Sequence, residues 1–298
     1  MSRSPWRPRG PWKCRPGNDL ATPLPASRDG PVGSGRHGGS AYHARLAPEL
    51  PPHEAEHVAR NVAAVRERIE AARGRGAHAA PAVRLVAVTN SASTACYARL
   101  ARAGVRDLGE NRVQDAAWRK PDAPPGLTWH GIGHLQRNKI AQAVATFDVF
   151  HALDSLRLAD ALEAHLADRG RRWPVFVQVN ASGEGQKGGF APEEALGVLE
   201  QVLQRHPHLE PVGWMTMAAF GAPEGDLRRT FRTLRALRDD ARRRGLGDPP
   251  PGELSMGMTD DFELAVEEGA TVVRVGRALF EGVASGVDVP PPATGDQA

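Results

Sequence analysis

The hydrophobic positions of residues 54–73 repeat with the period of an α-helix. Val58, Val62, Val65 and Ile69 follow one another at spacings of four, three and four residues, so they share one face of a helix. Beyond this segment, short apolar runs of strand length alternate with longer stretches of helical period, and polar or glycine-containing turns separate them. The pattern predicts an opening helix followed by a repeating strand–helix unit.

Eight of the apolar runs are predicted to be strands. They span residues 84–89, 106–109, 128–133, 149–154, 174–180, 211–217, 253–257 and 271–276, and the helices predicted between them include 155–169, 192–205 and 227–244. Strands and helices that alternate over about 230 residues predict an α/β fold with a single closed (β/α)8 barrel of the TIM type. An open doubly wound sheet is the alternative, but such sheets usually have fewer strands, and no Gly-x-Gly-x-x-Gly follows the first strand.

Polar side chains and glycines gather where the predicted strands end, whereas the middle of each strand is apolar. Ligands of (β/α)8 barrels bind at the carboxyl ends of the strands. The candidate ligand-binding residues are therefore Asn90, Asn111, His134, Met215, Ser255, Gly257, Arg274, Gly276 and Arg277. No catalytic residue is predicted among them.

Two of these strand ends suggest a phosphate site. The turns at Ser255–Gly257 and Gly276–Arg277 are each expected to begin a helix. Backbone N–H groups at a helix N-terminus bind a dianion, and glycine lets the ligand approach the backbone closely. Phosphate sites after the last two strands are common in this fold.

Arg274 and two histidines carry further expectations. Arg274 lies in the apolar run Val272–Val275 and needs a partner if it is buried. A structural ion pair with Glu110 or Asp154 is the alternative to a ligand contact. His130 and His134 are four strand residues apart, about 13 Å at ~3.3 Å per residue, which is too far to share a zinc ion. His130 is expected to be packed inside.

The composition divides the chain into three parts. Residues 1–48 carry eight Arg/Lys and two Asp and are rich in Pro and Gly, which predicts a disordered basic leader. The barrel is expected over 49–286, and 287–298 form a loose Pro-rich tail. Residues 49–298 carry thirty Arg/Lys and thirty-three Asp/Glu, so the charge does not indicate a nucleic-acid surface.

Cysteine content and hydropathy bear on the compartment. Cys14 and Cys96 are the two cysteines, a number that fits the reducing cytoplasm better than a disulfide framework. Cys96 is expected to be buried on a helix as a small hydrophobic residue. No apolar run approaches the ~20 residues that cross a bilayer.

Six ordered motifs resemble a known family. They are Gly-Glu-Asn at 109–111, Trp-His-Gly-Ile-Gly-His-Leu-Gln at 129–136, Gln-Val-Asn at 178–180, Lys-Gly-Gly-Phe at 187–190, Leu-Ser-Met-Gly-Met at 254–258 and Arg-Val-Gly at 274–276. Together they resemble the pyridoxal phosphate homeostasis proteins, which are related to the N-terminal barrel of alanine racemase, over residues 56–282.

The resemblance implies a fold-type III barrel without the second, β-rich domain of the racemase. It also implies a cytoplasmic protein that binds pyridoxal 5′-phosphate and affects vitamin B6 and amino-acid balance without robust turnover. In the related racemase barrel, the arginine that matches Arg274 faces the pyridine nitrogen. A permanent cation there disfavours protonation of that nitrogen.

Two residues depart from the family pattern. The family's first strand ends in a run similar to Ala-Val-Ser-Lys, whose lysine forms the Schiff base, whereas this chain has Ala87–Asn90. The amide of Asn90 cannot form an imine. Arg277 stands where the family usually has a small hydroxyl residue. Lys139 and Lys187 fit the family pattern, and either is an alternative imine former.

The first hypothesis is therefore a regulator that binds pyridoxal phosphate non-covalently and has no robust turnover. The alternatives are a barrel adapted to another phosphorylated ligand or to a protein partner, and a racemase-like or lyase-like enzyme. The enzyme hypothesis is disfavoured, because such chemistry needs the lysine and an opposed acid/base group. No nucleic-acid or membrane partner is expected, and the protein is expected to be a monomer or a weak dimer.

Overall fold

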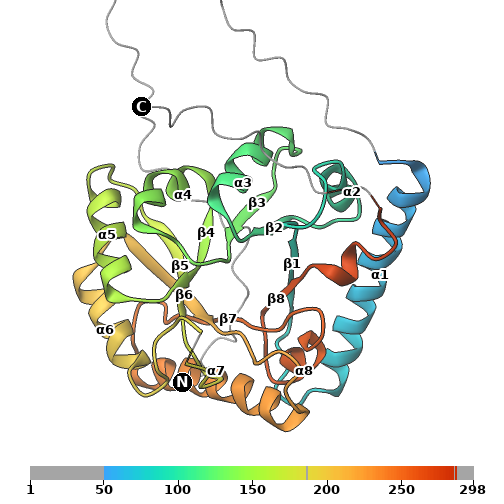
Figure 1. The fold of residues 1–298 in the computed structure, drawn as a ribbon. Helices are drawn as coiled ribbons and strands as arrows, with labels where there is room; N and C mark the ends of the chain where they lie inside the picture. Colours follow the sequence, from blue (N-terminus) through green and yellow to red (C-terminus); the bar gives the residue numbers. More distant parts are fainter. Residues whose placement is uncertain (1–49, 186, 285, 287–298) are drawn as a thin grey trace, which may run out of the picture.

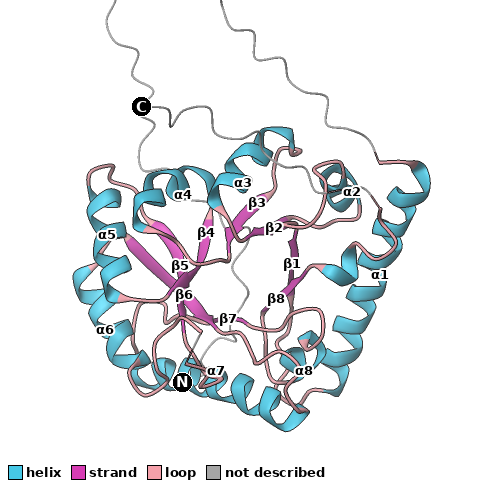
Figure 2. Ribbon diagram, in the orientation of Figure 1, coloured by secondary structure: helices cyan, strands magenta, loops and turns pink. Residues whose placement is uncertain are grey.

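Eight parallel strands form one closed barrel in the computed structural model, which describes residues 50–185, 187–284 and 286 (Figures 1 and 2). The strands are β1 Arg84–Val88, β2 Asp107–Glu110, β3 Thr128–Gly131, β4 Val149–Leu153, β5 Trp173–Gln178, β6 Leu209–Met215, β7 Glu253–Ser255 and β8 Val272–Val275. β1 closes the barrel by pairing with β8, with Ala87 opposite Val275. The predicted (β/α)8 barrel is confirmed, and the predicted leader and tail lie outside the described residues.

Helices surround the barrel (Figure 2). They are α1 Pro52–Arg75, α2 Cys96–Arg102, α3 Val113–Arg119, α4 Ile140–Thr146, α5 Leu156–Ala167, α6 Ala195–Arg205, α7 Glu224–Arg244 and α8 Phe262–Glu267, with the short 3-10 helices η1 Lys120–Asp122, η2 Arg137–Lys139 and η3 Arg277–Leu279. The predicted apolar face of α1 is buried, and so is Cys96. None of the helices in the described part of the chain has the length and hydropathy to cross a membrane.

The carboxyl ends of the strands differ from prediction by one or two residues, because loop packing decides where each ladder stops. β3 was expected to reach Gly133 but ends at Gly131. A Cβ atom at Gly133 would lie only 2.3 Å from the carbonyl oxygen of Asn111. The chain at Gly133 therefore packs against the loop after β2 instead of extending the strand.

The prediction that each candidate phosphate turn begins a helix is confirmed at Gly276–Arg277, where a short 3-10 helix begins, and was wrong at Ser255–Gly257. Gly276 is followed by the three-residue 3-10 helix η3. α8 begins at Phe262 rather than directly after Gly257. The Asp261 carboxylate accepts a hydrogen bond from the Met258 N–H at 2.6 Å, which holds the intervening residues in a turn.

Two apolar clusters stabilise the barrel. The larger fills the layer between the strands and the helices. The smaller lies inside the barrel and consists of Val86, Val149, Phe176, Val212, Met215 and Val272, with Met217 packed against it. The interior also holds buried polar side chains, among them His130, His151 and Arg274.

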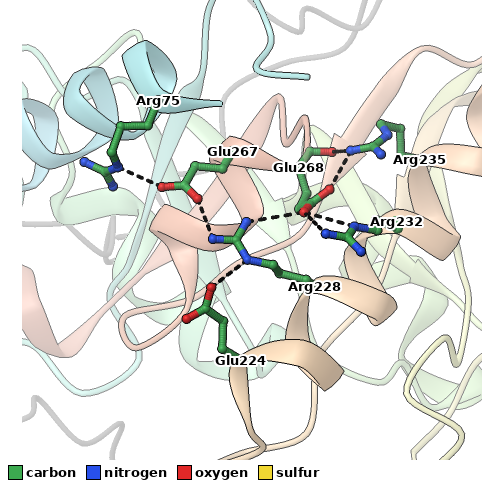
Figure 3. A network of polar contacts seen from close by, with 7 residues as sticks. All are labelled: Arg75, Glu224, Arg228, Arg232, Arg235, Glu267 and Glu268. Atoms are coloured by element: carbon green, nitrogen blue, oxygen red, sulfur yellow. Dashed lines mark hydrogen bonds and ion pairs between the residues drawn. The ribbon is translucent and has the colours of Figure 1, made fainter. Parts of the chain in front are cut away.

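A network of ion pairs joins α1, α7 and α8 on the outside of the barrel (Figure 3). Glu268, directly after α8, is 4% exposed and receives Arg228 at 3.3 Å, Arg232 at 3.1 Å and Arg235 at 2.7 Å. Glu267 receives Arg228 at 2.7 Å and Arg75 of α1 at 2.9 Å. Three helices that are distant in the sequence are thus tied together by two carboxylates.

We expect Glu268→Gln to lower the free energy of unfolding by about 2 kcal/mol, because three guanidinium groups lose their shared anionic acceptor. Burial raises the pKa of Glu268, but the hydrogen bonds from the arginines outweigh it and hold the pKa below its ordinary value. The contribution of this carboxylate is therefore present above the unfolded pKa of about 4.3 and is lost as the pH falls through the lowered folded value.

Urea denaturation of both proteins measures this effect, and the gap between them should shrink as the pH is lowered from 7 to 3. The matched control is Glu263→Gln on α8, whose partner Arg68 lies at 3.1 Å in an exposed pair. It should cost at most about 1 kcal/mol. Equal losses for the two variants would contradict the role of Glu268.

Candidate functional site

The predicted site residues all lie at the carboxyl-end rim of the barrel. Met215 and Ser255 are the last residues of β6 and β7, and they are opposite each other in the sheet. Arg274 lies in β8, one residue before its end. Asn90, Asn111, His134, Gly257 and Gly276 lie in the loops that follow β1, β2, β3, β7 and β8, and Arg277 begins η3. The structure therefore places at one end of the barrel nine residues that are scattered over 188 positions of the sequence.

Arg274 is the buried cation at the centre of this rim. It is 3% exposed. Its guanidinium donates to the Ser255 hydroxyl at 2.7 Å and to the Thr216 carbonyl at 2.9 Å. Burial lowers the pKa of Arg274 to about 10, so the group stays charged at neutral pH.

The alternative ion pair of Arg274 with Glu110 or Asp154 was wrong. The Glu110 carboxylate instead pairs with Arg119 of α3 at 3.2 Å. The Asp154 carboxylate contacts the His134 ring at 2.7 Å. Both carboxylates lie at other strand ends, where Arg119 and His134 are the nearer partners. Arg274 is therefore fixed by a hydroxyl and a carbonyl.

The two candidate phosphate turns lie beside Arg274. The Arg274 N–H donates to the Gly257 carbonyl at 3.0 Å, which couples the two turns through the backbone. Gly257 has φ +91°, and a Cβ atom there would lie 2.6 Å from Cβ of Ala265, so this position requires glycine. Among the described residues, the N–H groups of Gly257 and Arg277 donate no backbone hydrogen bond. They remain available to an anion.

The side chain of Arg277 points to solvent. It is 68% exposed and forms an ion pair with Asp260, in the loop after β7. The pair ties the two turns together across the rim. In this arrangement Arg277 offers its backbone N–H, rather than its guanidinium, to a ligand at the turns.

Asn111 and His134 line a second feature of the rim, a cavity of about 280 Å³ that Lys139 also lines. The exposed His134 ring bonds through Nδ1 to the Asp154 carboxylate at 2.7 Å. Because a carboxylate only accepts, Nδ1 carries the hydrogen and Nε2 is free to accept or to be protonated.

Asn90 is exposed directly beyond β1, and the residue before it is firmly anchored. Thr89 is fully buried, and its hydroxyl donates to Glu110 Oε1 at 2.6 Å. The Thr89 carbonyl accepts from Arg119 at 3.0 Å. The direction in which the chain leaves β1 is thereby fixed, and with it the position of Asn90.

The lysines differ in how freely they could reach a ligand. Lys187, in the loop after β5, donates to the Ala218 carbonyl at 2.8 Å and pairs with Glu184. Lys120 donates to the Thr146 carbonyl, at the opposite end of the barrel. Lys139 lines the cavity next to His134. Lys187 would have to break both contacts before its amine met another group.

Sequence reasoning missed a set of buried polar residues inside the barrel. His130 was expected to be packed, but its hydrogen-bond partners Asp107 and His151 were not identified. One signal was present for His151, which occupies an inward position of the otherwise apolar strand β4. Inward positions alternate along a strand, so a single polar residue at such a position marks the barrel interior.

The chemistry of this rim suits an anionic ligand with an acceptor atom. It offers a buried cation, two free backbone N–H groups and a glycine that permits close approach. Arg274, Ser255 and the two turns all lie on neighbouring strands β7 and β8. The arrangement can hold a dianion at the turns and a lone-pair acceptor at Arg274.

The comparisons with known proteins agree with this geometry. Residues 54–283 match the family model of the alanine racemase N-terminal domain. The chain is 36% identical over 234 residues to the pyridoxal phosphate homeostasis protein of Bos taurus, covering 73% of this chain and 84% of that protein. This decides the family. The chain belongs to the pyridoxal phosphate homeostasis proteins.

Further members of the family match to a similar extent. The protein of the same name from Pseudomonas aeruginosa is 38% identical over 225 residues, which cover 75% of this chain and 94% of that protein. The solved structure of PipY from Synechococcus elongatus with PLP bound superimposes with a TM-score of 0.65 at 32% identity, covering 75% of this chain and 99% of that one. The predicted resemblance is confirmed.

Proposed function

We propose that this chain binds pyridoxal 5′-phosphate reversibly and without a covalent bond, and that it acts in pyridoxal phosphate and amino-acid homeostasis rather than as an enzyme. The phosphate is held by the N–H groups at Gly257 and at Gly276–Arg277. The pyridine ring lies toward Arg274, with Met215, Asn111 and His134 on its other sides. The solved PipY structure with PLP bound supports the choice of ligand.

The observation that carries the proposal is the fixed position of Arg274 between the two turns. Its guanidinium is held by Ser255 and Thr216, so it presents its remaining donors without rearrangement. A buried cation attracts an acceptor nitrogen and a nearby dianion, and it keeps that nitrogen unprotonated. Pyridoxal phosphate supplies both groups together with an aldehyde.

Asn90 makes the binding non-covalent. It occupies the position that matches the Schiff-base lysine in the family pattern, and its amide nitrogen is not a nucleophile toward an aldehyde. Lys187 is held by Ala218 and Glu184, so its amine is not free to reach the ligand aldehyde. This leaves Asn90 as the side chain nearest to the aldehyde. The aldehyde stays free, as suits a protein that delivers its ligand. We further propose that it works in the cytoplasm as a monomer or a weak dimer.

We expect pyridoxal phosphate to raise the melting temperature, because a ligand that binds only the native state stabilises it by about 2.7 kcal/mol at one hundred times its Kd. The ligand should be lost on gel filtration, and borohydride should leave the protein unlabelled. Arg274→Gln should raise the Kd at least about tenfold, since a charge-assisted hydrogen bond to the ligand is worth ~1.5–3 kcal/mol. Equilibrium dialysis measures both constants.

The matched control is Arg277→Gln, whose side chain is exposed and paired with Asp260. If Arg277 contributes its backbone N–H, this variant should keep the Kd within about threefold. No thermal shift at millimolar ligand would refute the proposed function. A borohydride-stable label in the parent protein would refute the non-covalent mode, and peptide mapping would then locate the reactive lysine.

A further inference from the structure

A continuous chain of hydrogen bonds crosses the interior of the barrel. Arg274 of β8 contacts Ser255 of β7 at 2.7 Å. Ser255 Oγ lies 2.8 Å from His151 Nδ1 of β4. His151 Nε2 lies 2.9 Å from His130 Nδ1 of β3, and His130 Nε2 lies 3.0 Å from Asp107 Oδ1 of β2. All five residues are at most 6% exposed.

The two ends of the chain determine the direction of every hydrogen bond in it. A guanidinium only donates and a carboxylate only accepts. Asp107 therefore requires a hydrogen on His130 Nε2, which leaves Nδ1 of a neutral ring as an acceptor. His151 must then donate from Nε2 and accept at Nδ1, where Ser255 donates. Ser255 in turn accepts from Arg274, and every link is satisfied with both imidazoles neutral.

The surroundings of His151 favour its neutral state. Burial lowers the pKa of His151 well below its ordinary value, and the positive charges of Arg274 and Arg84 lower it further. Burial raises the pKa of Asp107, but its contacts with His130 and Arg84 leave the pKa below the ordinary value. Apolar side chains face the pair from β5 and β6: Phe176 stacks on His151 at 4.2 Å between ring centroids, and Met215 belongs to the same interior cluster.

The chain connects the two ends of the barrel. Asp107 and its partner Arg84, at 3.2 Å, line a cavity of about 690 Å³ at the amino ends of β1–β3. Ser255 and Arg274 lie at the opposite, carboxyl-end rim. An added proton cannot enter this chain without turning the Ser255 hydroxyl hydrogen away from His151, because His151 Nδ1 would then donate.

We propose that Asp107, His130 and His151 are positioning residues for the ligand pocket. The charge of Asp107, at the amino ends of the strands, sets the hydrogen bonding of Ser255 and Arg274 at the carboxyl-end rim. The inference rests on the proposed function for its ligand, but the chain itself is independent of it. Arg274 is held as a donor with fixed geometry because its acceptor, Ser255, is already committed to His151. The ligand affinity of the rim therefore depends on a carboxylate outside the rim.

The direction of the chain is tested in the full-length protein by 15N NMR of its labelled histidines at pH 7.5. Both His130 and His151 should be neutral with the hydrogen on Nε2. Asp107→Asn removes the group that requires a donor at His130, because an amide both donates and accepts. Its spectrum should show both tautomers of His130. An imidazolium, or an Nδ1–H form, at either histidine of the parent overturns the assigned direction.

The coupling to the ligand is tested by the Kd for pyridoxal phosphate in the same variant. Asp107→Asn should raise the Kd about tenfold, the size of a typical coupling between two sites. The matched control is Glu268→Gln: Glu268 is a buried acid on the outside of the barrel whose partners are arginines of α7. It should leave the Kd and both tautomers unchanged. An unchanged Kd in folded Asp107→Asn overturns the coupling.

A second variant keeps the proposal falsifiable if Asp107→Asn does not fold. Ser255→Ala removes the donor to His151 Nδ1 with little change in volume. Both histidines should keep their hydrogen on Nε2, because Asp107 still requires a donor at His130 and His130 still requires a donor at His151, and an Nδ1–H form at either ring would contradict the chain. If the parent binds no pyridoxal phosphate, the proposed function and the coupling both fail, whereas the histidine spectra still decide the direction of the chain.

Discussion

We expect Asn90→Lys to convert reversible binding of pyridoxal phosphate into a covalent adduct. Asn90 follows β1 directly, and Ala87 of β1 pairs with Val275 of β8. A lysine at position 90 therefore stands beside Gly276 and the proposed phosphate turns. Its amine can condense with the ligand aldehyde, so that one C=N bond forms and one water leaves. Holding the two groups together raises the yield even though most of an exposed amine is protonated at neutral pH.

The adduct is measured by absorbance. The variant should show a visible band that survives gel filtration and disappears with borohydride, whereas the parent should show no such band after gel filtration. Asn111→Lys is the matched control, because Asn111 is also exposed and follows the neighbouring strand β2. It should yield much less adduct. Binding of the ligand by Asn90→Lys without any adduct would mean that the aldehyde faces another part of the rim.

The fold was predictable because it depends on periods that repeat along the chain. The face of α1 and the eight apolar runs alternate so regularly that a closed barrel was the natural interpretation. The ends of the strands were not predictable, because they depend on contacts between loops. Because Asn111 lies close to Gly133, β3 ends two residues before its predicted end. No local sequence pattern predicts this contact.

The candidate site was predictable only in part, for a related reason. A charged residue in the apolar run around Arg274 is visible in one strand, so its importance could be inferred. Its partner Ser255 and the chain beyond it come from β7, β4, β3 and β2. These residues meet only when the barrel closes. The alternation along each strand marks them as inward, but nothing in the sequence tells which inward residues share a level of the barrel.

A second buried polar group at the rim carries the largest expected effect on stability. Arg119 of α3 and Glu110 of β2 are each 1% exposed. Their ion pair spans 3.2 Å, and Glu110 Oε1 also accepts from Thr89 at 2.6 Å and from Tyr97 at 3.4 Å. The group fixes the end of β1 beside Asn90. Desolvation raises the pKa of Glu110, while its hydrogen bonds and Arg119 oppose the rise.

We expect Arg119→Met to lower the free energy of unfolding by about 3–5 kcal/mol at pH 8, because it leaves the Glu110 carboxylate buried without its cation. Without Arg119 the folded pKa of Glu110 rises further. A carboxyl with a raised folded pKa contributes stability below its unfolded pKa and loses it as the pH rises through the folded value. The deficit measured by urea denaturation should therefore be smaller at pH 5 than at pH 8.

The double variant Glu110→Gln with Arg119→Met should lose less stability than the sum of the losses of the two single variants, because no buried charge remains. The control Arg102→Met, at an exposed position of α2, should stay within about 0.5 kcal/mol of the parent. A deficit that does not change with pH would show that Arg119 acts through packing alone.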